Sequence, residues 1–143
     1  MQSKSNANTE TMAKDILQRR FGFADFRSTQ RQIIDRTLAG GNSLVIMPTG
    51  GGKSLCFQIP ALVYAHAFVD CGSTVRERAP LTLVLSPLIA LMKDQVDALQ
   101  AKGIEATFIN SSLDRQERNR RIQQIAVMAH VLKGWDIILI PWK

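Results

Sequence analysis

The sequence predicts an α/β fold in which helices cover both faces of a parallel sheet of about four strands. Two observations lead to this prediction. The length of 143 residues, with 45% hydrophobic and 21% charged side chains, is that of one globular domain. Short apolar runs also alternate with amphipathic stretches of helical period, as in strands joined by crossover helices. The four runs lie at 43–47, 81–85, 105–109 and 137–140.

The ends of the helices are marked by residues that favour them. Ser28, Ser86 and Asp114 are the expected caps, because their side chains accept hydrogen bonds from the first free amides of a helix. Glycine adopts the left-handed backbone found just after a helix, and Pro60 predicts a bend because it has no N–H. These signals predict a flexible lead-in over 1–8, one domain over 9–143, and helices over 10–20, 28–39, 53–68, 87–102 and 114–133.

The charge and the cysteines limit the classes of protein to consider. The net charge of +6 comes from the two ends of the chain, residues 1–40 and 111–143, and suits either polyanion binding or a solvated basic surface. Cys56 and Cys71 lack metal-site spacing and are expected to be free thiols. No apolar stretch reaches membrane-spanning length and no secretory signal is visible. We therefore expect a soluble, cytoplasmic protein.

The strongest chemical signal is the segment 48–54 (PTGGGKS), between the first apolar run and a helix. Three consecutive glycines remove every Cβ where a backbone wraps round phosphate oxygens, and their N–H groups form an anion nest with the helix start. Lys53 can then reach the β- and γ-phosphates, and the Ser54 hydroxyl can bind the Mg²⁺ that bridges them. Because Met47 stands where the strict motif has glycine, the segment is a variant phosphate loop. A glycine-rich turn without a ligand is the alternative.

Three segments together resemble one family. Residues 47–62 (MPTGGGKSLCFQIPAL) are similar to motif I of the RecQ family of ATP-dependent DNA helicases, and residues 83–99 (LVLSPLIALMKDQVDAL) to its motif Ia. Residues 21–30 (FGFADFRSTQ) are similar to its motif 0. The resemblance implies a RecA-like P-loop NTPase fold, with ATP and Mg²⁺ as cofactors. It also implies ATP hydrolysis coupled to 3′-to-5′ unwinding of DNA, with single-stranded or forked DNA as the partner and a nucleoid location in a bacterium.

The resemblance also assigns roles in nucleotide binding. Phe23 and Arg27 are implied to sandwich adenine, by ring stacking and by the planar guanidinium, although Phe23 alone would equally suit a core aromatic. Gln30 is implied to read the N6 and N7 edge of adenine, which an amide matches with two hydrogen bonds. Lys53 and Ser54 are the implied catalytic residues. The complete predicted nucleotide site is Phe23, Arg27, Gln30, Thr49, Gly50, Gly51, Gly52, Lys53 and Ser54.

Two segments are predicted to contact DNA by the same comparison. Ser86 and the first amides of the helix after it are suited to a backbone phosphate, and Ser86 also suits a helix cap. Asn110 and Ser111 lie in a stretch similar to the family's next strand end. The arginines of residues 115–121 are expected to form a solvated face, in which Arg118 and Arg121 can pair with carboxylates four residues earlier.

One expected motif does not occur in these 143 residues. The family hydrolyses ATP with the help of an Asp-Glu-x-His string, which holds Mg²⁺ and positions the attacking water. The sequence therefore predicts part of a first motor domain, whose remainder would be a partner if the protein is split. A catalytically inactive module that binds ATP or nucleic acid stays open, as does an RNA helicase-like NTPase. A sheet of this extent also predicts an exposed apolar edge and weak stability.

Overall fold

The computed structural model describes residues 2–70, 80–128 and 137–141. The chain divides into two compact units, Met1–Val63 and Tyr64–Lys143, where the sequence predicts a single domain over 9–143. The first unit is helical, and the second contains the sheet. Together they are α/β, and the sheet is parallel as predicted. No helix in the described ranges has both the length and the apolar character needed to cross a bilayer.

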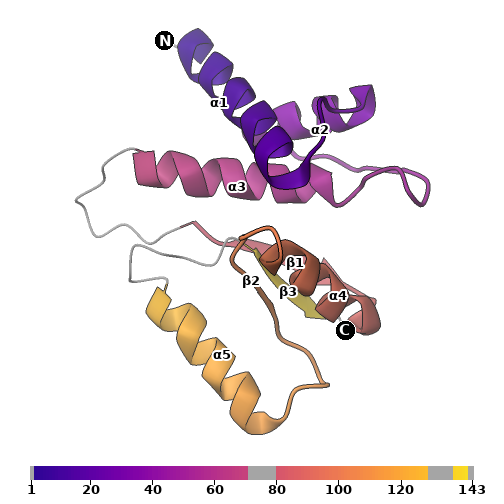
Figure 1. The fold of residues 1–143 in the computed structure, drawn as a ribbon, viewed down its shortest axis with the longest axis vertical. Helices are drawn as coiled ribbons and strands as arrows, with labels where there is room; N and C mark the ends of the chain where they lie inside the picture. Colours follow the sequence, from indigo (N-terminus) through magenta and orange to yellow (C-terminus); the bar gives the residue numbers. More distant parts are fainter. Residues whose placement is uncertain (1, 71–79, 129–136, 142–143) are drawn as a thin grey trace. The chain divides into compact units, whose positions relative to one another are not determined.

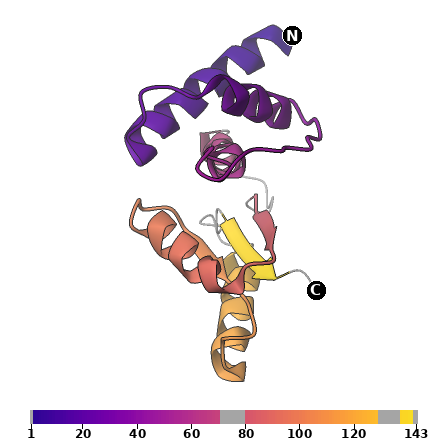
Figure 2. The ribbon, with the colours of Figure 1, turned by 90° about the vertical axis from the view of Figure 1, so that its right-hand side faces the viewer.

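The first unit begins with two helices (Figures 1 and 2). Helix α1 (Gln2–Ile16) starts inside the stretch predicted as a lead-in, continues as the π-helical turn η1 (Leu17–Phe21) and ends at Gly22, as predicted. Helix α2 spans Ser28–Leu38. Arg31 of α2 pairs with Glu10 of α1 at 2.9 Å and with Asp35 on its own helix. Ser28 is the first residue of α2 instead of its cap, a place that Arg27 takes.

Helix α3 (Leu55–Asp70) starts two residues later than predicted and includes Pro60. Its first half is strongly apolar, and Ile59 and Val63 are completely buried, as are Leu17 and Ile34 earlier in the unit. Cys56 is a buried free thiol whose pKa is raised by burial, and Cys71 lies outside the described residues. The buried side chains of α3 fix the start of the helix, and therefore the position of the glycine-rich segment just before it.

The first predicted strand does not form, and the prediction over 43–47 is wrong. Residues 41–48 have no regular secondary structure, and the side chains of Leu44 and Ile46 are 93% and 92% exposed. A strand needs a neighbouring strand to bond its backbone N–H and C=O groups, and none of the described strands pairs with this segment. The described sheet accordingly has three strands instead of about four.

The sheet lies in the second unit and has the strand order β1-β3-β2. Strands β1 (Thr82–Ser86), β2 (Ala106–Phe108) and β3 (Ile137–Pro141) confirm the other three strand predictions within a residue or two. Central β3 is buried at Ile137 and Leu139. Strand β1 is an edge of this described sheet, and its Leu83 and Leu85 are 55% and 61% exposed, so the expected apolar edge is present.

Two helices accompany the sheet. Helix α4 (Ile89–Gln100) packs against β2 and β3, and its buried stripe is Met92, Val96 and Leu99. It starts two residues later than predicted, and its N-cap is Leu88, so the prediction of Ser86 as the cap is wrong. Ser86 is the last residue of β1, and its hydroxyl accepts a hydrogen bond from the Leu88 amide at 3.3 Å. Helix α5 spans Arg115–Met128, and its predicted continuation to 133 lies outside the described residues, as does most of the predicted loop over 69–80.

Candidate functional site

The glycine-rich segment folds as a tight turn that leads into α3. Gly50 and Gly52 have φ angles of +79° and +81°, in the left-handed region where glycine alone is unstrained. Between them the Gly51 amide donates to the Pro48 carbonyl at 3.1 Å. The Leu55 amide then donates to the Gly52 carbonyl at 3.2 Å and starts the helix. The three glycines therefore allow the backbone to reverse direction at positions where a Cβ atom would cause strain.

Lys53 lies across this turn. Its ammonium group donates to the Met47 carbonyl at 2.9 Å and to the Pro48 carbonyl at 3.0 Å. Thr49, Lys53 and Ser54 are all exposed. A lysine that bonds neutral carbonyls at an exposed site gains more from phosphate oxygens, because charge-assisted hydrogen bonds are stronger than those to neutral acceptors. The arrangement therefore suits binding of a polyphosphate.

Two further side chains donate to carbonyls of this turn, one from the N-cap of α2 and one from α2 itself. Arg27 donates through Nη1 to the Gly50 carbonyl at 3.1 Å. Gln30, only 4% exposed, donates through Nε2 to the carbonyls of Gly51 at 3.4 Å and Gly52 at 3.2 Å. Its Oε1 accepts from the Arg27 amide at 3.0 Å, one half of a capping box at the start of α2. The structure thus places Arg27 and Gln30 against the phosphate loop, and their predicted contacts with adenine stay a prediction.

Phe23 occupies a different environment from Gln30. It follows Gly22, its amide donates to the Leu17 carbonyl at 3.4 Å, and its side chain is 54% exposed. An aromatic ring with half of its surface in water is not a core residue, which removes the alternative that it simply fills the interior. Its stacking role towards adenine stays a prediction.

The residues present also fit a magnesium ion that arrives with phosphate. The described parts of the chain contain no group of three or more His, Cys, Asp or Glu side chains able to hold a metal by themselves. Mg²⁺ commonly keeps several waters and takes its remaining ligands from phosphates and one or two protein oxygens. The exposed Ser54 hydroxyl is of that kind.

The residues predicted to contact DNA lie at the carboxyl ends of the parallel strands. Parallel strands end on the same side, and Ser86 is in register with Pro141 while Phe108 is in register with Leu139. Ser86 and the loop after β2, residues 109–114, are therefore separated by central β3, roughly 10 Å from strand to strand. Ser111 in this loop is exposed.

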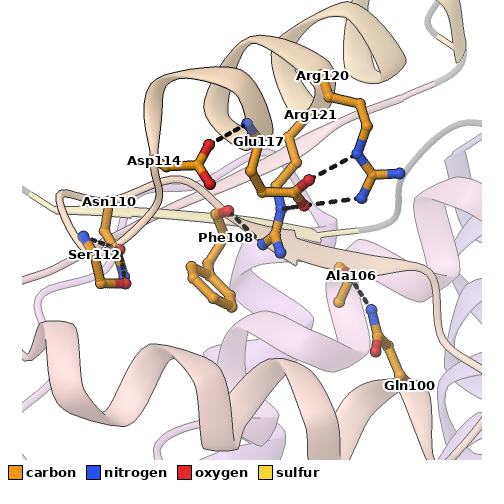
Figure 3. A network of polar contacts seen from close by, with 9 residues as sticks. All are labelled: Gln100, Ala106, Phe108, Asn110, Ser112, Asp114, Glu117, Arg120 and Arg121. Carbon is orange, nitrogen blue, oxygen red and sulfur yellow. Dashed lines mark hydrogen bonds and ion pairs between the residues drawn. The ribbon is translucent and has the colours of Figure 1, made fainter.

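Asn110 is turned inwards instead. It is 4% exposed, its Oδ1 accepts from the Ser112 amide at 2.9 Å and from the Ser112 hydroxyl at 2.6 Å, and its Nδ2 lies 3.6 Å from the Met92 sulfur (the pair with Ser112 is drawn in Figure 3). These contacts shape the 109–114 loop and join it to α4. The side chain of Asn110 therefore supports the loop, and Ser111 is the more accessible of the two predicted contacts.

The first turn of α5 closes this loop with a charged network (Figure 3). Asp114 accepts from the Glu117 amide at 2.7 Å, which confirms the predicted capping arrangement. Glu117 accepts from Arg120 at 2.7 and 2.9 Å and from Arg121 at 2.7 Å, and these hydrogen bonds lower the pKa of its carboxyl to about 2. The prediction that Arg121 pairs with a carboxylate four residues earlier is confirmed.

Comparison with known protein families identifies the fold. The family model described as DEAD/DEAH box helicase matches residues 27–139, most of the chain. The chain belongs to the DEAD/DEAH box helicase family. The matched residues include Gln30, the phosphate loop and the 109–114 loop, and Phe23 precedes them.

Individual relatives agree with this membership. The chain is 54% identical over 100 residues to the ATP-dependent DNA helicase RecQ of Pasteurella multocida, an alignment that covers 70% of this chain and 14% of that protein. It is 49% identical over 108 residues to RecQ of Haemophilus influenzae and 44% identical over 121 residues to RecQ of Bacillus subtilis, covering 74% and 84% of this chain. The chain thus spans 14 to 18% of the length of these relatives, and the predicted RecQ resemblance is confirmed.

Sequence reasoning missed one set of contacts to the 109–114 loop. Arg118 and Arg121 were expected on a solvated face, but both donate into the 109–114 loop or its start. Arg121 donates to the Phe108 carbonyl at 3.0 Å, and Arg118 donates at 3.4 Å to the carbonyls of Asn110 and Leu113. The four-residue spacing signalled only the carboxylate pairs, because acceptors on a loop that folds back leave no periodic pattern.

Proposed function

We propose that this chain is the nucleotide-binding part of a RecQ-type helicase, in which ATP hydrolysis drives 3′-to-5′ unwinding of DNA. The observation that carries the proposal is the position of Lys53, whose ammonium group spans the turn of the phosphate loop within 3.0 Å of two carbonyls. The names of the relatives, ATP-dependent DNA helicases, support the same activity.

In this proposal the loop binds a triphosphate by exchanging hydrogen bonds. Lys53 leaves the carbonyls of Met47 and Pro48 for β- and γ-phosphate oxygens, and the loop amides with the start of α3 add further donors. Ser54 would supply one oxygen ligand to Mg²⁺, and the ion would neutralise phosphate charge when bound. Because the exchanged bonds are of similar number, the loop needs no unfolding to accept its ligand.

Adenine recognition follows from α2 and its cap. Gln30 has a donor and an acceptor in one plane, used at present by the Gly52 carbonyl and the Arg27 amide. The same pair of atoms matches the N7 acceptor and N6 donor of adenine. Arg27 and Phe23 provide flat surfaces for the base. A turn of Gln30 towards adenine would release the loop carbonyls, so base binding and phosphate binding are expected to be coupled.

Titration of the chain with MgATP by calorimetry tests the nucleotide site. We expect saturable binding that Lys53→Ala weakens about ten- to hundredfold, since a charged hydrogen bond contributes about 1.5–3 kcal/mol. Lys93→Ala is the matched control, because it removes the same charge from an exposed i,i+4 pair on α4. Absence of saturable binding by the wild type, or identical behaviour of the two variants, would refute the proposal.

A second candidate is a nucleotide-binding module without turnover. It would bind MgATP through the same loop and the same lysine, so nucleotide binding alone does not distinguish the two candidates. Phosphate release in the presence of single-stranded DNA or RNA separates the candidates. Release that DNA stimulates and Lys53→Ala abolishes supports the helicase proposal, stimulation by RNA alone supports an RNA helicase, and binding without release supports the module.

A further inference from the structure

The loop between β2 and α5 is held by side chains of the helix that follows it. Arg121 is the principal contact, because its single guanidinium makes three contacts with two residues, Glu117 and Phe108. Its Nε donates to Glu117 at 2.7 Å, its Nη1 donates to the Phe108 carbonyl at 3.0 Å, and its Cζ lies 4.5 Å from the centroid of the Phe108 ring (Figure 3). The Arg121 and Glu117 side chains are 21% and 26% exposed, so both are largely shielded from water.

These contacts fix the direction in which the chain leaves β2. The carbonyl that Arg121 holds belongs to the last residue of the strand, and the next amide, of Ile109, donates to the Leu139 carbonyl of β3 at 2.9 Å. Asn110 then sets the Ser112 backbone with its buried carboxamide. Arg118 adds two longer contacts of 3.4 Å, but its buried Nε has no hydrogen-bond partner, which makes it the weaker of the two anchors.

We propose that Arg121, oriented by Glu117, is a positioning residue for DNA binding: it pre-orders the 109–114 loop so that exposed Ser111 meets a phosphate without the cost of ordering the loop. This inference rests on the proposed function, because it takes single-stranded DNA as the ligand of the 109–114 loop. Arg121 itself does not contact DNA in this account, since its donors are directed at Glu117 and Phe108.

Arg120 provides a matched control on the same turn of α5. It pairs with the same carboxylate, through Nε at 2.7 Å and Nη2 at 2.9 Å, and its side chain is 62% exposed. Its guanidinium approaches Glu117 on the side away from Phe108 (Figure 3). Arg120→Gln and Arg121→Gln therefore remove the same charge from the same partner, and only the second releases the loop. Non-specific attraction to phosphate falls equally in both variants.

The experiment measures affinity of the 143-residue chain for a fluorescent single-stranded oligonucleotide at low salt, with MgATP affinity and thermal midpoint as parallel readouts. We expect Arg121→Gln to bind DNA about three- to tenfold more weakly than Arg120→Gln, the cost of ordering one or two side chains on binding. MgATP affinity should be equal in the two variants. Arg121→Lys serves if the glutamine variant does not fold, because it retains the charge and the apolar stem but cannot bond both partners.

Hydrogen exchange of the Ile109 and Ser112 amides in the free chain supplies a readout independent of DNA. Faster exchange in Arg121→Gln than in Arg120→Gln supports the proposal that Arg121 orders the 109–114 loop, and equal exchange overturns it. If the wild type binds DNA and the two glutamine variants bind it equally well, the inference fails while the proposed function stands. If the wild type binds no DNA, the DNA part of the proposed function fails, and with it the role of the loop in binding.

Discussion

The phosphate loop and the 109–114 loop are both held by side-chain hydrogen-bond donors, but the donors of the second loop have more contacts. In both, cationic or amide side chains donate to backbone carbonyls of a loop that follows an apolar run and precedes a helix. At the phosphate loop the donors include exposed Lys53 and Arg27, bound to neutral carbonyls. At the 109–114 loop the main donor is Arg121, which a carboxylate and an aromatic ring also hold.

The difference separates a binding loop from a supporting one. A donor that bonds only neutral carbonyls in water loses little when a charged ligand replaces them, so the phosphate loop is suited to exchange. A donor that also holds an ionised partner and a buried ring loses all three contacts when it moves, so the second loop is suited to remain ordered. The predictions below change one feature of this contrast at a time.

The largest effect is expected from Gly52→Ala. A Cβ at this position would lie 2.1 Å from Nε2 of Gln30 on a backbone with φ of +81°, so the variant suffers both strain and a displaced Gln30. We expect a loss of about 2–4 kcal/mol in the free energy of unfolding, measured by denaturant titration, from left-handed strain and lost hydrogen bonds. MgATP affinity should fall with it.

Gly50→Ala separates the two causes. Its φ of +79° is nearly the same, but a Cβ there meets nothing within 4 Å, so only the strain of about 1–2 kcal/mol is expected. In a Gln30→Ala background the extra cost of Gly52→Ala over Gly50→Ala should disappear, as a double-mutant cycle would report. Equal costs of the two alanine variants in the wild-type background would show that Gln30 does not hold the loop.

An intermediate effect is expected from acid, acting on the second loop. Hydrogen bonds from Arg120 and Arg121 lower the pKa of Glu117 from 4.5 to about 2, so the folded chain binds fewer protons than the unfolded chain between these values. The contribution of Glu117 to stability is therefore complete above about pH 4.5 and is lost as the pH falls towards 2.

Thermal midpoints of the wild type and Glu117→Gln across this range check the sign. The wild type should be the more stable protein at pH 6, and the difference should shrink as the pH approaches 2. A difference that stays constant down to pH 2 would mean that the carboxylate is not held by the two arginines.

The smallest effect is expected at the segment that leads into the phosphate loop. Ile46 is 92% exposed, so Ile46→Ser should change the free energy of unfolding by less than about 0.5 kcal/mol. Ile34→Ala, at a completely buried position of α2, should cost about 2–5 kcal/mol and serves as the contrast. A loss above about 1 kcal/mol for Ile46→Ser would indicate that residues 43–47 pack as the strand that their sequence favours.

Much of this molecule follows from local sequence. Gly22 ends the first helical segment, Asp114 caps α5 and three apolar runs form strands in a parallel sheet, because each signal acts through neighbours a few residues away. The phosphate loop is equally local, since the consecutive glycines, Lys53 and Ser54 are adjacent in the chain. The family resemblance also required nothing beyond the order of three motifs.

Only the tertiary structure decided which strands pair and which side chains bond distant backbone carbonyls. The run at 43–47 has the composition of a strand, yet a strand exists only where another strand bonds it, and none of the described ones does so. Gln30 is buried against glycine carbonyls 21 and 22 residues away, and Arg121 holds a carbonyl 13 residues earlier. Hydrogen-bond partners at such separations depend on how the chain folds back, and no residue pattern along the sequence specifies that.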